Sequence, residues 1–359
     1  MKKLLGLILT LIIIMALASC DFLNNGLPNN EAGNSNNNGD IPEFDDSEYS
    51  SEGVVYAVSV DGTYALVVGY KGNAEKVKID SEYNGLPVKS IYWQAFSGKS
   101  TITNIIVPDS VTSIDKEAFY GCTALDSIII GKGVTSIDAS ALFTCVHLTN
   151  ISVSANNQRY KSVNGNLYSK DGKTLERYTP FKSETEFIIP DGVTAIGSGA
   201  FGYSVNLTSI IIPSSVTSIG ASAFGACYRL TSIIIPDGVT SIGSGAFANC
   251  LTLASITIPD NVTSIGGNTF SHCYDLTSIV IPDSVTSIGN YAFEECSSLT
   301  SLIIPDSVTS IAKWAFDGCD ALADVYYTGS EDEWSKIIIG NGNEELQNAT
   351  IHYEYVPKE

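Results

Sequence analysis

A sequence motif of 23 residues repeats through most of this 359-residue chain. One copy reads Leu230-Thr-Ser-Ile-Ile-Ile-Pro-Asp-Gly-Val-Thr-Ser-Ile-Gly-Ser-Gly-Ala-Phe247-Ala-Asn-Cys250, and the next copy begins at Leu253. A period of this length is typical of solenoids, in which each copy forms one turn that packs on its neighbours. The repeat therefore predicts an elongated fold, and it directs the search for function toward a long surface rather than a catalytic pocket.

An isoleucine followed five residues later by a phenylalanine marks each copy. The pairs are Ile91/Phe96, Ile114/Phe119, Ile196/Phe201, Ile219/Phe224, Ile242/Phe247, Ile265/Phe270, Ile288/Phe293 and Ile311/Phe316. In a ninth copy, which contains Ile137, Leu142 takes the phenylalanine position and Cys145 keeps its usual spacing. These columns indicate side chains that face inward and pack on the same position of the next turn.

The other half of each copy is a short β-branched run that ends at proline, as in Ile210–Ile212 before Pro213. Such runs predict strands, and proline ends each strand because it cannot donate a further ladder bond. We expect parallel pairing between turns with a rise of about 4.8 Å. The segment from phenylalanine to cysteine is too short for an independent helix, so we expect a single helical or 3₁₀ turn there.

The complete pattern, Leu-x-x-Ile-x-Ile-Pro-x-x-Val-x-x-Ile-x-x-x-Ala-Phe-x-x-Cys, resembles that of BspA-like leucine-rich-repeat proteins over about residues 53–355. The resemblance implies a β-rich α/β solenoid, a right-handed leucine-rich-repeat superhelix of 23-residue turns with a parallel β-sheet. Members of that family are often described as microbial surface adhesins that bind host extracellular-matrix proteins. The resemblance therefore implies adhesion to host or neighbouring-cell proteins, without enzymatic activity.

The first residues have the pattern of an export signal. Met1-Lys-Lys precedes an apolar run over residues 4–18, and Leu17-Ala-Ser-Cys20 resembles a bacterial lipobox. The run is short for a membrane span, so residues 1–19 are predicted to be a lipoprotein signal peptide. The prediction is an exported protein, lipid-anchored through Cys20 at the bacterial cell surface; an ordinary signal peptide with a chance cysteine is the alternative. Residues 20–52 are rich in Asn and predict a disordered tether.

Composition and motifs exclude several classes of function. A net charge of −20 argues against nucleic acid as a partner, because phosphates require cationic side chains. The chain lacks the short motifs of nucleotide-binding, metalloprotease and hydrolase sites, so we predict no catalytic residues and no cofactor. With three histidines and no CxxC pair, we also predict no metal site.

Seven cysteines share one position of the repeat: Cys122, Cys145, Cys227, Cys250, Cys273, Cys296 and Cys319. We expect them to form a ladder of buried thiols, although neighbouring positions would be close enough for disulfides. A second column follows the prolines and consists of Asp109, Asp191, Asp237, Asp260, Asp283 and Asp306. Hydrogen bonds to turn backbone explain these carboxylates, and weak calcium binding is the alternative.

Both ends of a solenoid need a cover. Residues 53–88 are predicted to be an N-terminal β cap, residues 89–322 the solenoid, and residues 323–359 a C-terminal cap. The period breaks once, at about residues 155–186, where Asn164-Gly165 and Asp171-Gly172 predict hairpin turns. This insertion, which carries several Lys and Arg residues, is read as a solvated hairpin or as part of a binding site.

One column of the strands is predicted to face away from the core. Its candidate partner-binding residues are Ile106, Ile129, Ile188, Ile211, Ile234, Val280, Ile303 and Tyr326, interrupted by Ser152 and Thr257. A contiguous exposed apolar stripe is a candidate surface for an extracellular protein, either a host matrix or a cell-surface protein. Strand propensity with packing along the ladder is the alternative. A glycan is the other possible partner, with Tyr326, Trp334, Tyr160, Tyr168 and Tyr178 as its aromatic candidates.

Overall fold

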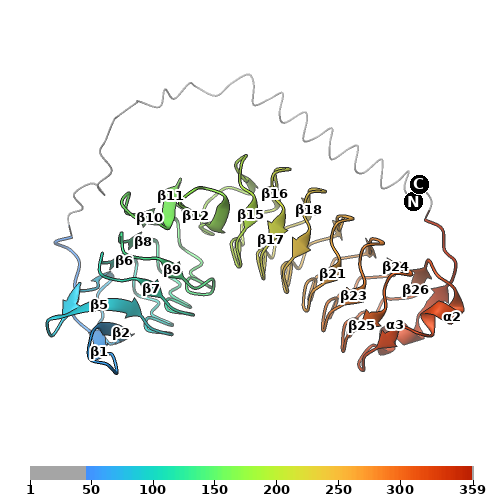
Figure 1. Cartoon of the computed structure of the whole chain (residues 1–359), viewed down its shortest axis with the longest axis horizontal. Coiled ribbons are helices and arrows are strands. Elements are labelled where there is room, and N and C mark those ends of the chain that lie inside the picture. Colours follow the sequence, from blue (N-terminus) through green and yellow to red (C-terminus); the bar gives the residue numbers. More distant parts are fainter. Residues whose placement is uncertain (1–45, 358–359) are drawn as a thin grey trace, which may run out of the picture.

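The computed structural model describes residues 46–357 of the chain. The predicted signal peptide, Cys20 and most of the predicted tether lie outside these residues. Within them, stacked turns follow one another along an arch (Figure 1). The predicted solenoid of parallel strands is confirmed, with very little helix.

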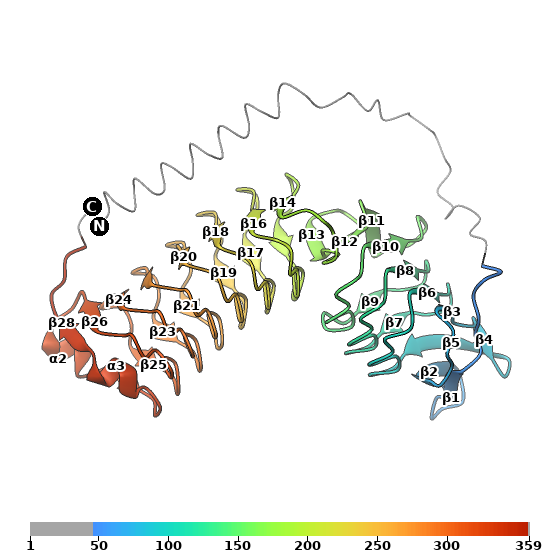
Figure 2. The ribbon, with the colours of Figure 1, turned by 180° about the vertical axis from the view of Figure 1, so that it is seen from behind.

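Each regular turn contributes one longer and one shorter strand, and the two kinds form two rows along the arch (Figure 2). The longer strands are β6 (Asn104–Val107), β8 (Ser127–Ile130), β10 (Asn150–Val153), β14 (Glu186–Ile188), β16 (Ser209–Ile211), β18 (Ser232–Ile234), β20 (Ser255–Ile256), β22 (Ser278–Val280), β24 (Ser301–Ile304) and β26 (Asp324–Tyr327). The shorter strands are β7 (Ser113–Ile114), β9 (Ser136–Ile137), β15 (Ala195–Ile196), β17 (Ser218–Ile219), β19 (Ser241–Ile242), β21 (Ser264–Ile265), β23 (Ser287–Ile288) and β25 (Ser310–Ile311).

Strand pairing follows the sequence repeat without slippage. In the pair of β16 with β18, Ser209 lies opposite Ser232 and Ile210 lies opposite Ile233. The pair of β17 with β19 has the same 23-residue offset. A slip of one residue would turn every isoleucine to the opposite face of the sheet, so the inward column fixes the register.

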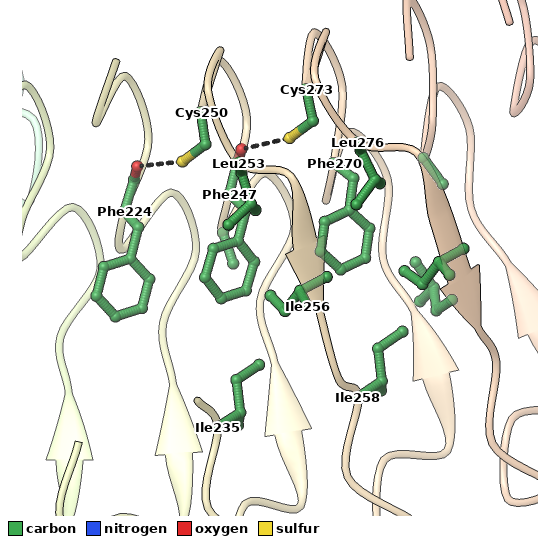
Figure 3. Close-up of a cluster of buried hydrophobic side chains, with 14 of the residues drawn as sticks. Phe224, Ile235, Phe247, Cys250, Leu253, Ile256, Ile258, Phe270, Cys273 and Leu276 are labelled. Atoms are coloured by element: carbon green, nitrogen blue, oxygen red, sulfur yellow. Dashed lines mark hydrogen bonds between the residues drawn. The ribbon is translucent and has the colours of Figure 1, made fainter. Parts of the chain in front are cut away.

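Phenylalanine rings and thiols fill the centre of the turns (Figure 3). From Phe201 to Phe316 the rings stack almost parallel, with centroids 5.1 to 5.6 Å apart. The seven ladder cysteines are all buried and free, which confirms the predicted thiol ladder. Each thiol donates a hydrogen bond to a phenylalanine carbonyl of the preceding turn, as Cys273 does to Phe247 at 3.3 Å.

The segment from phenylalanine to cysteine is not a helical or 3₁₀ turn, so that prediction was wrong. It belongs to a longer segment between isoleucine and cysteine. It is a run of tight turns in which two positions adopt positive φ angles. In one turn these are Asn268 (φ 58°) and His272 (φ 60°), and in the next Tyr291 (φ 58°) and Glu295 (φ 58°). A left-handed residue breaks helical bonding, which explains why the segment curves back toward the next strand.

Threonine hydroxyls add two further ladders between turns. Thr240 Oγ1 donates to the carbonyl of Thr217 at 3.3 Å, and Thr231 Oγ1 donates to the carbonyl of Thr208 at 3.2 Å. The same kind of bond recurs in other turns, for example from Thr300 to Thr277. These hydroxyls reinforce the backbone ladder, which accounts for their regular recurrence in the sequence.

The N-terminal end is closed by β-structure. Strands β1 (Val54–Val58) and β2 (Ala65–Tyr70) form an antiparallel hairpin, and β2 pairs in parallel with β5 (Leu86–Ile91). Strand β3 (Lys76–Lys78) extends the longer row by pairing with β6, and β4 (Glu82–Tyr83) pairs with β5. The rings of Tyr70 and Phe96 lie 5.6 Å apart, so the cap continues the aromatic core.

The insertion is part of the sheet that the shorter strands form, and it is not a solvated hairpin. Strands β11 (Tyr160–Val163), β12 (Asn166–Ser169) and β13 (Thr174–Arg177) form an antiparallel meander, and β13 then pairs in parallel with β15. Tyr160, Tyr168 and Tyr178 are at most 5% exposed. Their rings supply the apolar surface that the interrupted repeat does not, and Tyr178 stacks on Phe201 at 5.3 Å.

The C-terminal end adds two short helices and two strands. Helix α2 (Glu331–Trp334) begins with a capping box between Ser330 and Glu333, and α3 (Glu344–Asn348) follows. Strand β27 (Ile338–Ile339) extends the shorter row, while β28 (Thr350–His352) extends the longer row. Trp334 packs edge-on against Tyr327, so its indole helps to close the last layer of the core.

Candidate binding surface

Four consecutive apolar positions of the predicted stripe are open to solvent. Ile188 is 53% exposed, Ile211 42%, Ile234 56% and Val280 49%. In each of their strands the preceding residue is largely buried, as the 5% exposure of Ile233 beside Ile234 shows. Strand alternation therefore places these four side chains on the outer face of the longer row, and we call them the exposed strip.

The strip is shorter than the sequence predicts. Ile129 is only 8% exposed, and Ile106 is partly buried. At the other end Ile303 is partly buried as well. Tyr326 is covered by the chain itself, because His352 stacks on its ring at 4.8 Å and Tyr355 lies against it at 4.7 Å. The exposed part of the predicted stripe is therefore confined to its middle, and at the C-terminal end His352 and Tyr355 cover Tyr326.

A row of carboxylates runs beside the strip. Asp237, Asp260 and Asp283 each follow the proline that ends a strand, and all three are exposed. No group of three or more His, Cys, Asp and Glu side chains in residues 46–357 could hold a metal ion. The carboxylates thus form an acidic border to an apolar strip and do not converge on one point.

A groove of about 410 Å³ opens at the C-terminal end of the strip. Val280 and Ile303 contribute apolar walls, and Asp260 and Asp283 contribute carboxylates. Pro357 lies against the same groove. The arrangement suits a side chain that presents an apolar stem and a cationic end, because the stem and the charge would meet separate walls.

The solenoid is charged unevenly along its length. Residues 187–357 hold three Lys or Arg and 17 Asp or Glu, whereas residues 46–186 hold 13 Lys or Arg and 16 Asp or Glu. The exposed strip belongs to the acidic half. Long-range attraction at this surface therefore favours a basic partner.

The aromatic residues predicted for glycan binding do not form an open platform. Tyr160, Tyr168 and Tyr178 are buried, Trp334 is half-buried against Tyr327, and Tyr326 is covered. An aromatic side chain binds a sugar through an accessible face. These five side chains therefore do not form one open aromatic platform, and glycan binding stays a prediction.

Sequence reasoning missed a different set of aromatic residues, on the loops near the cysteine positions of the repeat. Phe143 and Tyr203 have ring centroids 6.3 Å apart, and Tyr203 meets Tyr228 edge-on at 6.4 Å. Tyr228 is 36% exposed, and nearby Tyr120 is 40% exposed. Tyr120 and Phe143 share one position of the repeat, but Tyr203 and Tyr228 occupy two others, so no single sequence column marks the set.

None of the helices in residues 46–357 is both long and apolar enough to cross a bilayer. The two helices of the C-terminal end are single short turns on the closing layer of the core.

The repeat matches a known family. The model of the BspA type leucine rich repeat region matches in six copies, at residues 73–170, 177–296 and 263–338. No curated protein sequence matches the chain significantly.

Several solved leucine-rich-repeat structures resemble the chain to different degrees. A leucine-rich repeat protein from Eubacterium ventriosum is 24% identical, with a TM-score of 0.59, over 86% of this chain and 95% of the other. One from Bacteroides ovatus is 25% identical, with a TM-score of 0.49, over 86% of this chain and 71% of the other. A leucine rich cell surface protein from Faecalibacterium prausnitzii is 24% identical, with a TM-score of 0.33, over 81% of this chain and 97% of the other.

The likeness to the Eubacterium protein shows a shared fold, and the family model covers more than half of the sequence. The chain is therefore a member of the BspA-type leucine-rich-repeat family.

Proposed function

We propose that this chain is a lipid-anchored binding scaffold at the bacterial cell surface that captures an extracellular protein on its exposed strip. The observation that carries the proposal is the alignment of Ile188, Ile211 and Ile234, each at least 42% exposed, on one face of the sheet β14-β16-β18-β20, with Val280 equally open on β22, the next strand of the longer row. Apolar residues gathered on one exposed face are typical of interaction sites.

The acidic surroundings of the strip narrow the chemistry of the partner. The best fit is a protein with an apolar ridge flanked by Lys or Arg. The ridge would contact the strip, and the cationic side chains would meet Asp237, Asp260 and Asp283. Such charge complementarity speeds association and selects partners more than it raises affinity. Non-enzymatic adhesion to host matrix or neighbouring-cell protein is the corresponding biological role.

Anchoring rests on the sequence of residues 1–20, where a basic start, an apolar run and Leu17-Ala-Ser-Cys20 follow one another. Lipid on Cys20 would hold the solenoid at the membrane, with residues 21–52 between them. Metabolic labelling with a radioactive fatty acid tests this: the native chain should take up label, and Cys20→Ala should not. Equal labelling of both would refute anchoring at Cys20.

Partner capture is tested with the chain from residue 21 onward, probed against an array of extracellular-matrix proteins and a glycan array. We expect binding to a protein, and at least tenfold weaker binding by the variant Ile211→Ser/Ile234→Ser/Val280→Ser. The control variant Tyr120→Ser/Tyr228→Ser removes exposed aromatic surface from the loops near the cysteine positions and should bind normally. Loss of binding in the control alone would place the site on the loops, and glycan binding alone would refute a protein partner.

A further inference from the structure

The groove at the C-terminal end of the exposed strip brings apolar and acidic side chains to one space. Val280 and Ile303 line it from strands β22 and β24, and Asp260 and Asp283 line it from the turns after β20 and β22. Asp283 comes three residues after Val280, a separation of at most about 10 Å in extended backbone. One long side chain could therefore contact the apolar wall and the carboxylates together.

Within the part of the chain that the structure describes, the two carboxylates of the groove have no ion-pair partner. Asp237 and Asp306 stand at the same position as Asp260 and Asp283, in the turns on either side. Successive turns of a parallel solenoid follow one another at about 4.8 Å. Like charges at this spacing repel one another, so a cation bound among them would stabilise the surface.

The N-terminal part of the solenoid shows how this column of the repeat holds a lysine. Asp109 stands at the same position as Asp260, and in the next turn Lys132 replaces the aspartate. The Lys132 ammonium group lies 3.1 Å from Asp109 Oδ2, and the Lys132 backbone N–H donates to Oδ1 at 2.8 Å. In the groove the neighbouring position is a second aspartate, Asp283, so an ammonium group has to come from outside the column.

We propose that the groove receives a lysine side chain of the captured protein, an inference that rests on the proposed binding at the exposed strip. The stem of the lysine would lie against Val280 and Ile303, and its ammonium group would lie between Asp260 and Asp283. An apolar side chain would cover the walls but would leave two carboxylates without a counter-charge. A metal ion would gain nothing from the apolar walls.

The two separate carboxylates favour lysine over arginine. A guanidinium pairs best with both oxygens of one carboxylate, whereas an ammonium group is a compact charge that can contact carboxylates from two turns. Asp260 and Asp283 are exposed, so solvent and salt weaken the attraction. A single lysine should therefore bind with a Kd on the order of 10 mM, and more weakly at high salt. In a protein interface the lysine would act together with contacts along the strip.

Methyl NMR of the full chain tests the groove with the peptide acetyl-Gly-Gly-Lys-Gly-Gly-amide at low ionic strength. The methyl signals of Val280 and Ile303 should shift as the peptide is added, whereas those of Ile188, at the far end of the strip, should not. Two altered peptides separate the walls of the groove. One carries ε-acetyl-lysine, which keeps the stem without the charge, and the other carries 2,4-diaminobutyric acid, which keeps the charge on a shorter stem. Each should bind about fivefold more weakly or worse.

A matched pair of variants tests the carboxylates. Asp260→Asn/Asp283→Asn keeps the shape of the groove and removes both charges, so it should bind the lysine peptide about tenfold more weakly. Asp191→Asn removes an exposed carboxylate of the same column outside the groove, and it should bind as the native chain does. All three aspartates are exposed, so these substitutions leave the core intact.

The possible results distinguish this inference from the proposed capture. If neither Val280 nor Ile303 responds to the lysine peptide, or if Asp260→Asn/Asp283→Asn captures the partner protein as well as the native chain does, the lysine site is refuted while the strip can stand. Lys358 follows Pro357 in the sequence. Peptide binding by Lys358→Gln alone would assign the groove to the chain's own lysine and overturn the inference. Specific peptide binding without any partner on the protein array would support the lysine site and count against the proposed capture.

Discussion

The thiol of Cys250 donates a hydrogen bond to the backbone carbonyl of Phe224, in the preceding turn, over 3.2 Å (Figure 3). The two residues are fully buried, and the same bond joins Cys227 to Phe201 and Cys296 to Phe270. A buried carbonyl cannot bond to water. An apolar residue at the cysteine position would therefore leave the phenylalanine carbonyl with one hydrogen-bond donor fewer. The thiol combines small apolar volume with a weak donor, which suits a position enclosed by rings.

Burial of the thiols predicts loss of stability at alkaline pH. It raises the pKa of Cys145, Cys227 and Cys273 to about 12, above the value near 9 expected in the unfolded chain. The folded state therefore holds protons that the unfolded state releases, and the stabilisation is complete below about pH 9. Between about pH 9 and 12 the free energy of unfolding should fall by about 1.4 kcal/mol per pH unit for each thiol.

Denaturant titrations across this pH range measure the slope. Cys273→Ala should reduce the slope of the unfolding free energy against pH by the equivalent of one proton. Lys336→Gln, at the C-terminal end, should change this slope little. Iodoacetamide should leave all seven thiols of the native protein unmodified at pH 8 and modify them after unfolding. Rapid alkylation of Cys250 in the native protein would contradict its place in the core.

The phenylalanine stack predicts that the loss of stability depends on how much of one side chain is removed. Phe247 lies between Phe224, at a centroid distance of 5.1 Å, and Phe270, at 5.6 Å. Phe247→Ala should cost about 3–5 kcal/mol because it leaves a cavity that the rigid turns cannot close. Phe247→Leu should cost less, about 1–2 kcal/mol, since Leu142 already occupies this position in another turn. Chemical denaturation compares the two, and equal small costs would mean that the ring is not packed.

Neighbouring residues of β18 provide a matched pair for testing which face is inward. Ile233 is 5% exposed and Ile234 is 56% exposed. Threonine at position 233 would bury its hydroxyl in the core, whereas the hydroxyl of threonine at position 234 would face solvent. Ile233→Thr should lower the free energy of unfolding by about 2–3 kcal/mol, and Ile234→Thr should change it by less than about 0.5 kcal/mol. The reverse order would show that the strand faces the other way.

The left-handed positions predict that glycine is better tolerated than a branched residue. Glu295 is exposed and has a φ of 58°, and glycine stands at the same position of other turns as Gly98, Gly121 and Gly318. Glu295→Gly should raise the unfolding midpoint slightly, by the equivalent of about 0.5–1 kcal/mol, whereas Glu295→Val should lower it by about 1–2 kcal/mol. Differential scanning calorimetry distinguishes the two, and a stabilising valine would contradict the backbone geometry.

The repeat predicted the fold because each inward position recurs, and stacking is the only way to bury isoleucine, phenylalanine and cysteine columns together. The exposed strip followed from strand alternation, but its length did not. Tyr326 is covered by His352, which lies opposite it on the last strand β28, and by Tyr355 in the segment that follows. Contacts of this kind depend on where the final segment folds back, and the pattern of one turn carries no information on that.

The insertion was harder still to predict. Asn164-Gly165 and Asp171-Gly172 marked its two hairpins, yet polar sequence suggested a solvated excursion. The structure instead buries Tyr168 and Arg177 where a regular turn would have supplied isoleucine and phenylalanine. A single arginine that bonds to carbonyls of two separate loops has no periodic signature. Glycine recurs at one left-handed position as Gly98, Gly121 and Gly318, but other residue types stand there in other turns, so composition alone does not identify the turn geometry.

Hydrogen exchange of the complex with the captured protein tests the binding surface most directly. Backbone amides of β16, β18 and β22 should gain protection on binding, together with residues around Asp260 and Asp283, while the loops that carry Tyr120 and Tyr228 keep their free exchange rates. Protection confined to those loops, with unchanged exchange along the three strands, would contradict recognition by the exposed strip.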